Sequence, residues 1–217
     1  MMKNWLKQSW QLLFIVIIVQ IPTTGNILAA KVNITRDMPY VDVRVKGKTY
    51  RIQRIQDTKN KLTNSFSKTS RPCPPFCIHP ISVAQGVDTV GEIELIRFLK
   101  DKVEVGRGVL VDARIPAFYK KGTIPGSVNI PFTLLSQGNS AYLDRILSIL
   151  GAVKDGGGRW NFSNARDLLL YCNGPWCDQS PRAIRGLLSA GFPNSKLLYY
   201  RGGMQNWQAL GLTTVKP

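Results

Sequence analysis

The sequence has a single histidine, His79, and few acidic residues. One histidine argues against a zinc site built from several imidazoles and against a histidine acting as general base beside a cysteine. The 13 acidic residues are outnumbered by 29 lysines and arginines, which gives a formal net charge of +16. Such an excess can bind lipid, nucleic acid or small anions, but the basic residues are dispersed and form no helical stripe. We therefore expect a solvated basic surface, no nucleic-acid partner and no metal or other cofactor.

An uninterrupted apolar run lies near the N-terminus, at residues 12–19, after a lysine-containing start. Pro22 breaks the run, and residues 28–30 offer a small-residue exit, a pattern typical of an export signal. The run is short for a membrane span, and an uncleaved anchor is the alternative. We expect residues 1–30 to be a signal peptide, the mature protein to be periplasmic or secreted, and no stable membrane span to be left after processing.

Four cysteines form two close pairs, Cys73 with Cys77 and Cys172 with Cys177. The first pair lies in a stretch with four prolines, residues 71–80, which excludes a helix or a central strand. In an oxidising compartment such pairs are disulfides or redox-active thiols. We expect a disulfide between Cys73 and Cys77; a copper or zinc site is the alternative, although the sequence offers few further ligands nearby.

Residues 31–88 form a basic N-terminal segment. Apolar and polar residues alternate at 40–45 and again at 49–52 around a glycine-containing turn, which predicts a β-hairpin. Residues 57–71 are polar and resemble an exposed linker. The Cys-Pro-rich loop follows them.

From residue 89 onward, buried strands alternate with helices. A capping box is expected at Thr89 to Glu92, with a helix after it. The apolar patterns predict further strands at 108–112, 128–131, 168–171 and 196–200, and helices at 116–120, 141–150, 181–190 and 204–210. This alternation predicts an α/β domain over residues 89–217, with a mainly parallel sheet covered by helices on both faces.

The second cysteine pair lies where such a sheet places its ligand sites. A fully apolar strand delivers Cys172 to its carboxyl end, and a helix is expected to open at Ser180 as N-cap with Pro181 at the first helical position. The unpaired amides and the dipole of that helix would stabilise a thiolate and bind small anions. Arg182, in the first turn, would add positive potential.

Three segments together resemble the rhodanese-like sulfurtransferases over roughly residues 90–215. Val111-Asp112-Ala113-Arg114 followed by residues 122–131 is similar to the family's Asp-x-Arg and Gly-His-Ile-Pro-Gly segment. Tyr171-Cys172 matches the nucleophile position, and residues 201–211 resemble the closing Gly-Gly-x-x-x-Trp signature.

The resemblance implies that the Cys172 thiolate attacks a sulfane sulfur and holds it as a persulfide. The substrate would be a small sulfur-containing anion or a thiol, held in the loop and the helix start. The residues expected to bind it are Asn173, Gly174, Trp176, Gln179 and Arg182. Asp112 and Arg114 are expected to be structural, as a hydrogen-bonded pair that fixes loops.

The loop departs from the family pattern at two positions. Cys177 stands where the family usually has arginine, and could resolve a modified Cys172 by forming a disulfide. Asp178 stands where phosphatase relatives need arginine, which argues against phosphatase activity. Two functions stay open: a sulfurtransferase centred on Cys172, or a non-catalytic rhodanese-fold module or thiol-redox partner of a periplasmic oxidation system. The chain loosely resembles exported rhodanese-like proteins of quinoprotein oxidation systems, which indicates a periplasmic protein as a possible partner.

Overall fold

The computed structural model describes residues 31–136 and 140–217. The expected signal peptide, residues 1–30, lies outside the described residues, so its cleavage stays a prediction. The described strands are β1 (Tyr40–Val45), β2 (Lys48–Gln53), β3 (Asp88–Val90), β4 (Gly108–Asp112), β5 (Val128–Asn129), β6 (Val153–Lys154), β7 (Trp160–Asn161), β8 (Asp167–Tyr171) and β9 (Leu197–Tyr200). The described α-helices are α1 (Glu92–Phe98), α2 (Pro116–Tyr119), α3 (Phe132–Leu135), α4 (Ser140–Ile149), α5 (Gln179–Ser189) and α6 (Gly203–Ala209).

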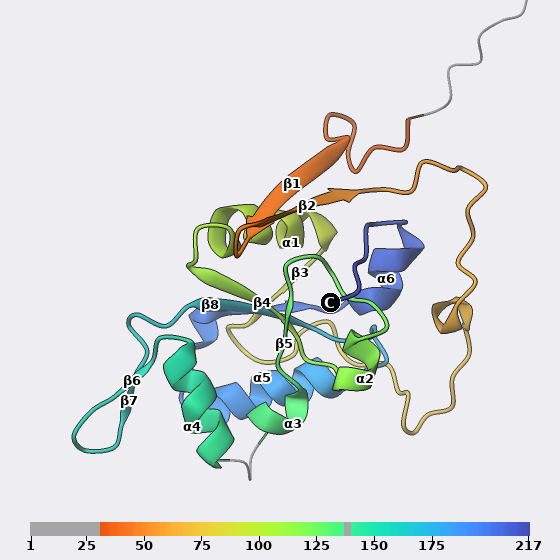
Figure 1. The fold of residues 1–217 in the computed structure, drawn as a ribbon. Coiled ribbons are helices and arrows are strands. Elements are labelled where there is room, and N and C mark those ends of the chain that lie inside the picture. The colour runs from red at the N-terminus through yellow and green to blue at the C-terminus, as the bar shows by residue number, and fades with distance from the viewer. Residues whose placement is uncertain (1–30, 137–139) are drawn as a thin grey trace, which may run out of the picture. The chain divides into compact units, whose positions relative to one another are not determined.

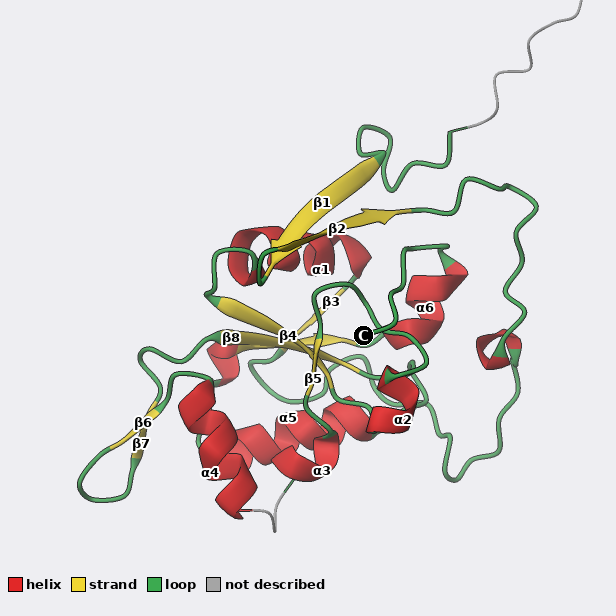
Figure 2. Cartoon of the chain, in the orientation of Figure 1, coloured by secondary structure: helices red, strands yellow, loops and turns green. Residues whose placement is uncertain are grey.

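The centre of the fold is a parallel sheet with strand order β3-β9-β8-β4-β5. Helices cover both of its faces: α3, α4 and α5 lie on one side, and α1 and α6 on the other (Figures 1 and 2). The middle strands are apolar on both faces because both are covered, and β4 is buried along its whole length. The α/β architecture expected from the sequence is confirmed.

Alternate residues of the strands face two separate cores. On the α5 side, Leu168 and Leu170 of β8 pack with Ile184 and Leu187 of α5. On the α6 side, Leu169 of β8 packs in a cluster that also contains apolar residues of α1 and α6. The period-two alternation of a strand thus divides one apolar run between two hydrophobic layers.

The expected hairpin is present as the antiparallel pair β1 and β2, joined by a turn in which Lys46 and Gly47 have φ values of 51° and 81°. Two left-handed residues in succession suit a tight hairpin turn. Val43 and Ile52 point from the hairpin into the α6-side core and are fully buried. The N-terminal segment is therefore part of the same packed unit as the sheet, which spans Lys31–Pro217.

Several local expectations were wrong. The short edge strand β3 was not expected, and Thr89 lies within it rather than capping α1. Gly91 is the N-cap of α1, and its N–H donates to the Glu94 carboxylate at 3.1 Å. Helix α5 opens two residues before the expected start, with Asp178 as N-cap, so that Ser180 lies inside the first turn.

No helix within residues 31–136 and 140–217 is both long and apolar enough to cross a membrane.

Candidate active site at the end of strand β8

The loop that begins with Cys172 is fixed by the start of helix α6. The N–H of Met204 donates to the carbonyl of Cys172 at 3.0 Å, and the N–H of Gln205 donates to the carbonyl of Asn173 at 2.9 Å. These bonds satisfy two amides at the start of α6 and direct the carbonyls of Cys172 and Asn173 toward it. The close approach requires Gly203, because a β-carbon there would lie 2.5 Å from the Cys172 carbonyl oxygen.

The thiol of Cys172 has a lowered pKa even though it is 2% exposed. Burial acts to raise the pKa of this thiol, but the Cys177 side chain, the Ser180 hydroxyl and the N–H groups of Ser180 and Gly174 outweigh burial. Ser180 is fully buried, and its hydroxyl also interacts with the phenol of Tyr199. The start of α5 therefore stabilises a thiolate here, although through Ser180 within the first turn rather than as N-cap.

Cys177 lies against Cys172 but is not bonded to it. Both thiols are free and buried, and the Cys172 thiol donates to the carbonyl oxygen of Cys177 at 3.3 Å. Burial and the neighbouring Cys172 raise the pKa of the Cys177 thiol well above its ordinary value. The Asn173 side-chain amide lies 3.8 Å from the Cys177 sulfur. The pair thus divides into one acidic thiol and one that holds its proton.

A pocket of about 400 Å³ opens beside the loop. Its lining includes Cys177 but not Cys172, so Cys177 is the loop cysteine that borders the pocket. The other lining residues are Asn64, Ser65, Phe66, Arg71, Pro75, Phe76, Arg114, Phe118, Lys121, Gly122, Asn173, Trp176, Asp178, Gln179 and Gln208.

Trp176 forms part of the pocket wall and is held at both its edge and its face. Its indole N–H donates to Gln205 Oε1 at 2.5 Å. The Arg71 guanidinium lies over the indole ring at 4.0 Å, and the Phe76 ring meets the indole edge-on with centroids 5.5 Å apart. The Trp176 side chain is half-buried in this position and lines the pocket.

Of the remaining loop residues expected to bind substrate, some line the pocket and others do not. Asn173 and Gln179 line it, and Gly174 directs its N–H toward Cys172 instead. Arg182 is absent from the lining: its guanidinium stacks over Phe132 at 4.5 Å and lies 3.9 Å from Asp178. Arg182, which was expected to add positive potential beside Cys172, therefore lies on the outer surface of α5.

Asp112 and Arg114 form a buried ion pair at the end of β4. Arg114 donates from Nε and from one terminal nitrogen to the two carboxylate oxygens of Asp112, at 2.8 and 2.6 Å. The same terminal nitrogen donates to the carbonyl of Gly122, and the hydroxyls of Thr123 and Tyr171 donate to Asp112. This network joins two loops at the carboxyl edge of the sheet, and Arg114 also reaches the pocket wall.

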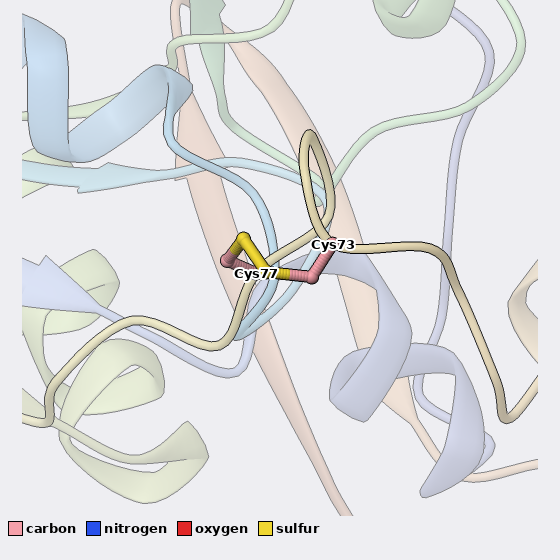
Figure 3. The surroundings of a disulfide bond; sticks show 2 residues. All are labelled: Cys73 and Cys77. Carbon is pink, nitrogen blue, oxygen red and sulfur yellow. A yellow bond between two sulfur atoms is a disulfide. The ribbon is translucent and has the colours of Figure 1, made fainter.

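The Cys-Pro-rich loop packs directly on the site. Cys73 and Cys77 are joined by a disulfide with Cα atoms 4.6 Å apart, which closes a tight loop around Phe76 (Figure 3). After the disulfide, the N–H of His79 donates to the carbonyl of Pro175 at 2.9 Å, and Arg201 donates to the carbonyl of His79 at 2.6 Å. A segment that is far away in sequence is thus tied to the Cys172 loop.

Sequence reasoning missed the pocket residues that lie outside the cysteine loop, chiefly Phe66, Arg71, Phe76 and Lys121. An arginine and two phenylalanines within an otherwise polar, proline-rich segment were the available signal, since such side chains need a surface to pack on. No group of three or more histidine, cysteine or acidic side chains able to hold a metal ion occurs in the part of the chain that the structure describes.

Comparison with known proteins assigns the family. A family model described as "Rhodanese-like domain" matches residues 95–210, more than half of the chain. The chain therefore belongs to the rhodanese-like family.

Among curated proteins, the chain is 31% identical over 125 residues to the HTH-type transcriptional regulator Rv0324 of Mycobacterium tuberculosis, covering 58% of this chain and 43% of that protein. The chain thus spans less than half the length of this relative. Among solved structures, the human single-domain sulfurtransferase TSTD1 is 26% identical, with 56% of this chain and 96% of that chain covered and a TM-score of 0.38. The Rhodanese_3-like domain of the Alr3790 protein from Anabaena sp. is 28% identical, with 49% and 97% covered and a TM-score of 0.34.

Proposed function

We propose that this chain is an exported sulfurtransferase in which Cys172 accepts a sulfane sulfur as a persulfide and Cys177 acts as the resolving thiol. The observation that carries the proposal is the geometry around Cys172: a loop clamped by α6 presents the N–H of Gly174, and α5 presents the N–H of Ser180, to one buried sulfur. The substrate would be a small sulfur-containing anion or a thiol. Export is supported by the apolar run at residues 12–19 and by the Cys73–Cys77 disulfide.

In the first step, the Cys172 thiolate attacks the outer sulfur of a donor such as thiosulfate. A sulfur–sulfur bond forms to Cys172, the donor's own sulfur–sulfur bond breaks, and sulfite leaves with the electron pair. The negative charge moves to the outer sulfur of the persulfide, where the aligned amides can stabilise it.

In the second step, the Cys177 sulfur attacks the inner sulfur of the persulfide. A Cys172–Cys177 disulfide forms, and hydrosulfide leaves with the proton that Cys177 carried. An external dithiol then reduces the disulfide. Because Cys172 is buried and does not line the pocket, side chains at the pocket floor, Cys177 among them, must move when the donor enters.

The test is mass spectrometry of the protein after incubation with thiosulfate. The native protein should gain one sulfur atom on Cys172 transiently and then lose two hydrogens as the Cys172–Cys177 disulfide forms. Cys172→Ser should gain no sulfur while it stays folded. Cys177→Ser should accumulate the persulfide because resolution is lost. Sulfur uptake in Cys172→Ser equal to that of the native protein would end the nucleophile assignment.

The second candidate function is a non-catalytic rhodanese-fold module that binds a protein partner in a periplasmic oxidation system. The observation that favours it is the burial of Cys172, which is 2% exposed. Alkylation by iodoacetamide decides between the two. A Cys172 that reacts with a midpoint below the ordinary thiol pKa indicates an enzyme, and one that reacts only after unfolding indicates the module.

A further inference from the structure

The pocket beside Cys177 is built largely by a segment outside the family match. Residues 64–76 contribute Asn64, Ser65, Phe66, Arg71, Pro75 and Phe76 to its lining, and the rhodanese-like match begins only at residue 95. We call these six residues the N-terminal wall. The wall turns the mouth of the loop into a chamber of about 400 Å³, a volume typical of sites for organic ligands and far larger than an inorganic oxyanion needs.

The wall is held firmly enough to select a ligand. On one side, Gln205 links Trp176 to the wall, because its Oε1 accepts from the indole and its Nε2 donates to the carbonyl of Phe66 at 3.3 Å. On the other side, the disulfide closes the loop that carries Phe76. Phe76 and Trp176 therefore present aromatic surface at a fixed place in the chamber.

The charge of the chamber favours an anion. Arg71 and Lys121 line it, and Asp178 is the single acidic residue in the lining. Arg114 is already paired with Asp112, so it adds little net charge. The Nε of Arg71 is buried and has no hydrogen-bond partner among the described residues, while a terminal nitrogen donates to the carbonyl of Ser65. One guanidinium donor is thus left unsatisfied beside an aromatic surface.

We infer that the N-terminal wall makes this a site for organic sulfur anions: a sulfane-sulfur donor with an apolar or aromatic body next to its negative group. The body would lie against Phe76 and Trp176, the anionic group near Arg71, and the sulfur at the Cys177 end of the chamber. This inference rests on the proposed function for the chemistry that follows binding, but the binding itself does not need that chemistry.

Three compounds that each donate one sulfane sulfur test the inference: thiosulfate, methanethiosulfonate and benzenethiosulfonate. With a thiosulfonate, the Cys172 thiolate forms a bond to the outer sulfur, the sulfur–sulfonyl bond breaks, and the sulfinate leaves with the electron pair. The rate constant for persulfide formation is measured by mass spectrometry at low donor concentration, and the same donors are reacted with a small free thiol to correct for leaving-group reactivity.

The corrected preference for benzenethiosulfonate over methanethiosulfonate should be at least about tenfold in the native protein, since a phenyl group buries much more apolar area than a methyl group. Phe76→Ala should lose most of this preference. Tyr142→Ala removes an aromatic side chain that is 60% exposed on α4 and should keep it. Arg71→Gln should slow both thiosulfonates about tenfold, whereas Arg159→Gln, at an exposed arginine outside the chamber, should not.

Binding of unreactive benzenesulfonate and methanesulfonate to Cys172→Ser, measured by calorimetry, separates this inference from the proposed function. If benzenesulfonate binds more tightly than methanesulfonate and Phe76→Ala abolishes the difference, the inference is supported even if no donor transfers sulfur. In that case the proposed function alone fails. A corrected preference close to one, together with equal or undetectable binding of the two sulfonates, would overturn the inference even if Cys172 forms a persulfide with thiosulfate.

Discussion

Replacing Gly203 by alanine should damage the Cys172 loop more than it damages the rest of the fold. The β-carbon would lie 2.5 Å from the Cys172 carbonyl oxygen and 2.7 Å from the Gly174 nitrogen, distances that packed atoms do not adopt. Gly203 also has a φ of 57°, which costs a residue with a β-carbon about 1 kcal/mol. Moving the loop away would weaken the two hydrogen bonds from Met204 and Gln205, each worth about 1 kcal/mol. We expect a total loss of about 3 kcal/mol in the free energy of unfolding.

The matched control is Gly47→Ala in the β1–β2 turn. Gly47 has a φ of 81°, but an added β-carbon there would meet no atom within 4 Å, so only the conformational cost of about 1 kcal/mol applies. Urea unfolding measures both losses. Persulfide formation should slow about tenfold in Gly203→Ala, because the displaced amide of Gly174 no longer stabilises the thiolate, and should be unchanged in Gly47→Ala. Equal losses of stability in the two variants, with unchanged reactivity of Cys172, would refute this account of the loop.

Three further predictions concern the cysteines and the N-terminus. Cys172 and Cys177 should form a reversible disulfide, so activity should depend on a mild thiol reductant; equal activity with and without it, in the native protein and in Cys177→Ser alike, would make Cys177 a bystander. The Cys73–Cys77 disulfide should resist labelling in a free-thiol titration under denaturing, non-reducing conditions, and stoichiometric copper or zinc bound to the two cysteines would contradict this. Removing the disulfide by a double serine substitution should lower the free energy of unfolding by about 2 kcal/mol for so short a loop, and an unchanged urea midpoint would contradict that. Mature exported protein should begin after about residue 30, in keeping with the length of export signals, and N-terminal sequencing that still finds Met1 would favour an uncleaved anchor.

The sheet could be predicted because its signals are local. Leu168, Leu169 and Leu170 are adjacent in sequence and buried on both faces, and such runs identify covered strands without knowledge of their neighbours. The position of Cys172 follows from the end of that run. The edge strand β3 could not be predicted from Asp88, Thr89 and Val90, because three residues carry no period and the strand exists only through its pairing with β9.

The pocket wall could not be predicted for a different reason. Arg71 and Phe76 are more than ninety positions away from Trp176 in the sequence, and nothing in their own segment indicates what they will face. Their placement depends on backbone hydrogen bonds, such as the one from the N–H of His79 to the carbonyl of Pro175. Nearly every residue can form such bonds, so no sequence pattern marks them. The burial of Cys172 could not be predicted for the same reason, because the exposure of a loop side chain depends on how the loop folds.

The surroundings of the two loop thiols shift their pKa values in opposite directions, which is what the proposed roles of Cys172 and Cys177 require. Against the effect of burial, the pKa of Cys172 is lowered by the Cys177 side chain, the Ser180 hydroxyl and two amides. The pKa of Cys177 is raised by burial and by the neighbouring Cys172. The lowered pKa suits Cys172 to attack as a thiolate, and the raised pKa suits Cys177 to hold a proton. Once a persulfide forms, the negative charge moves one sulfur away from Cys172, and the repulsion that kept Cys177 protonated weakens. In the proposed mechanism, the same contact that keeps Cys177 protonated before sulfur arrives lets it attack afterwards, and Cys177 delivers the proton that the departing hydrosulfide needs.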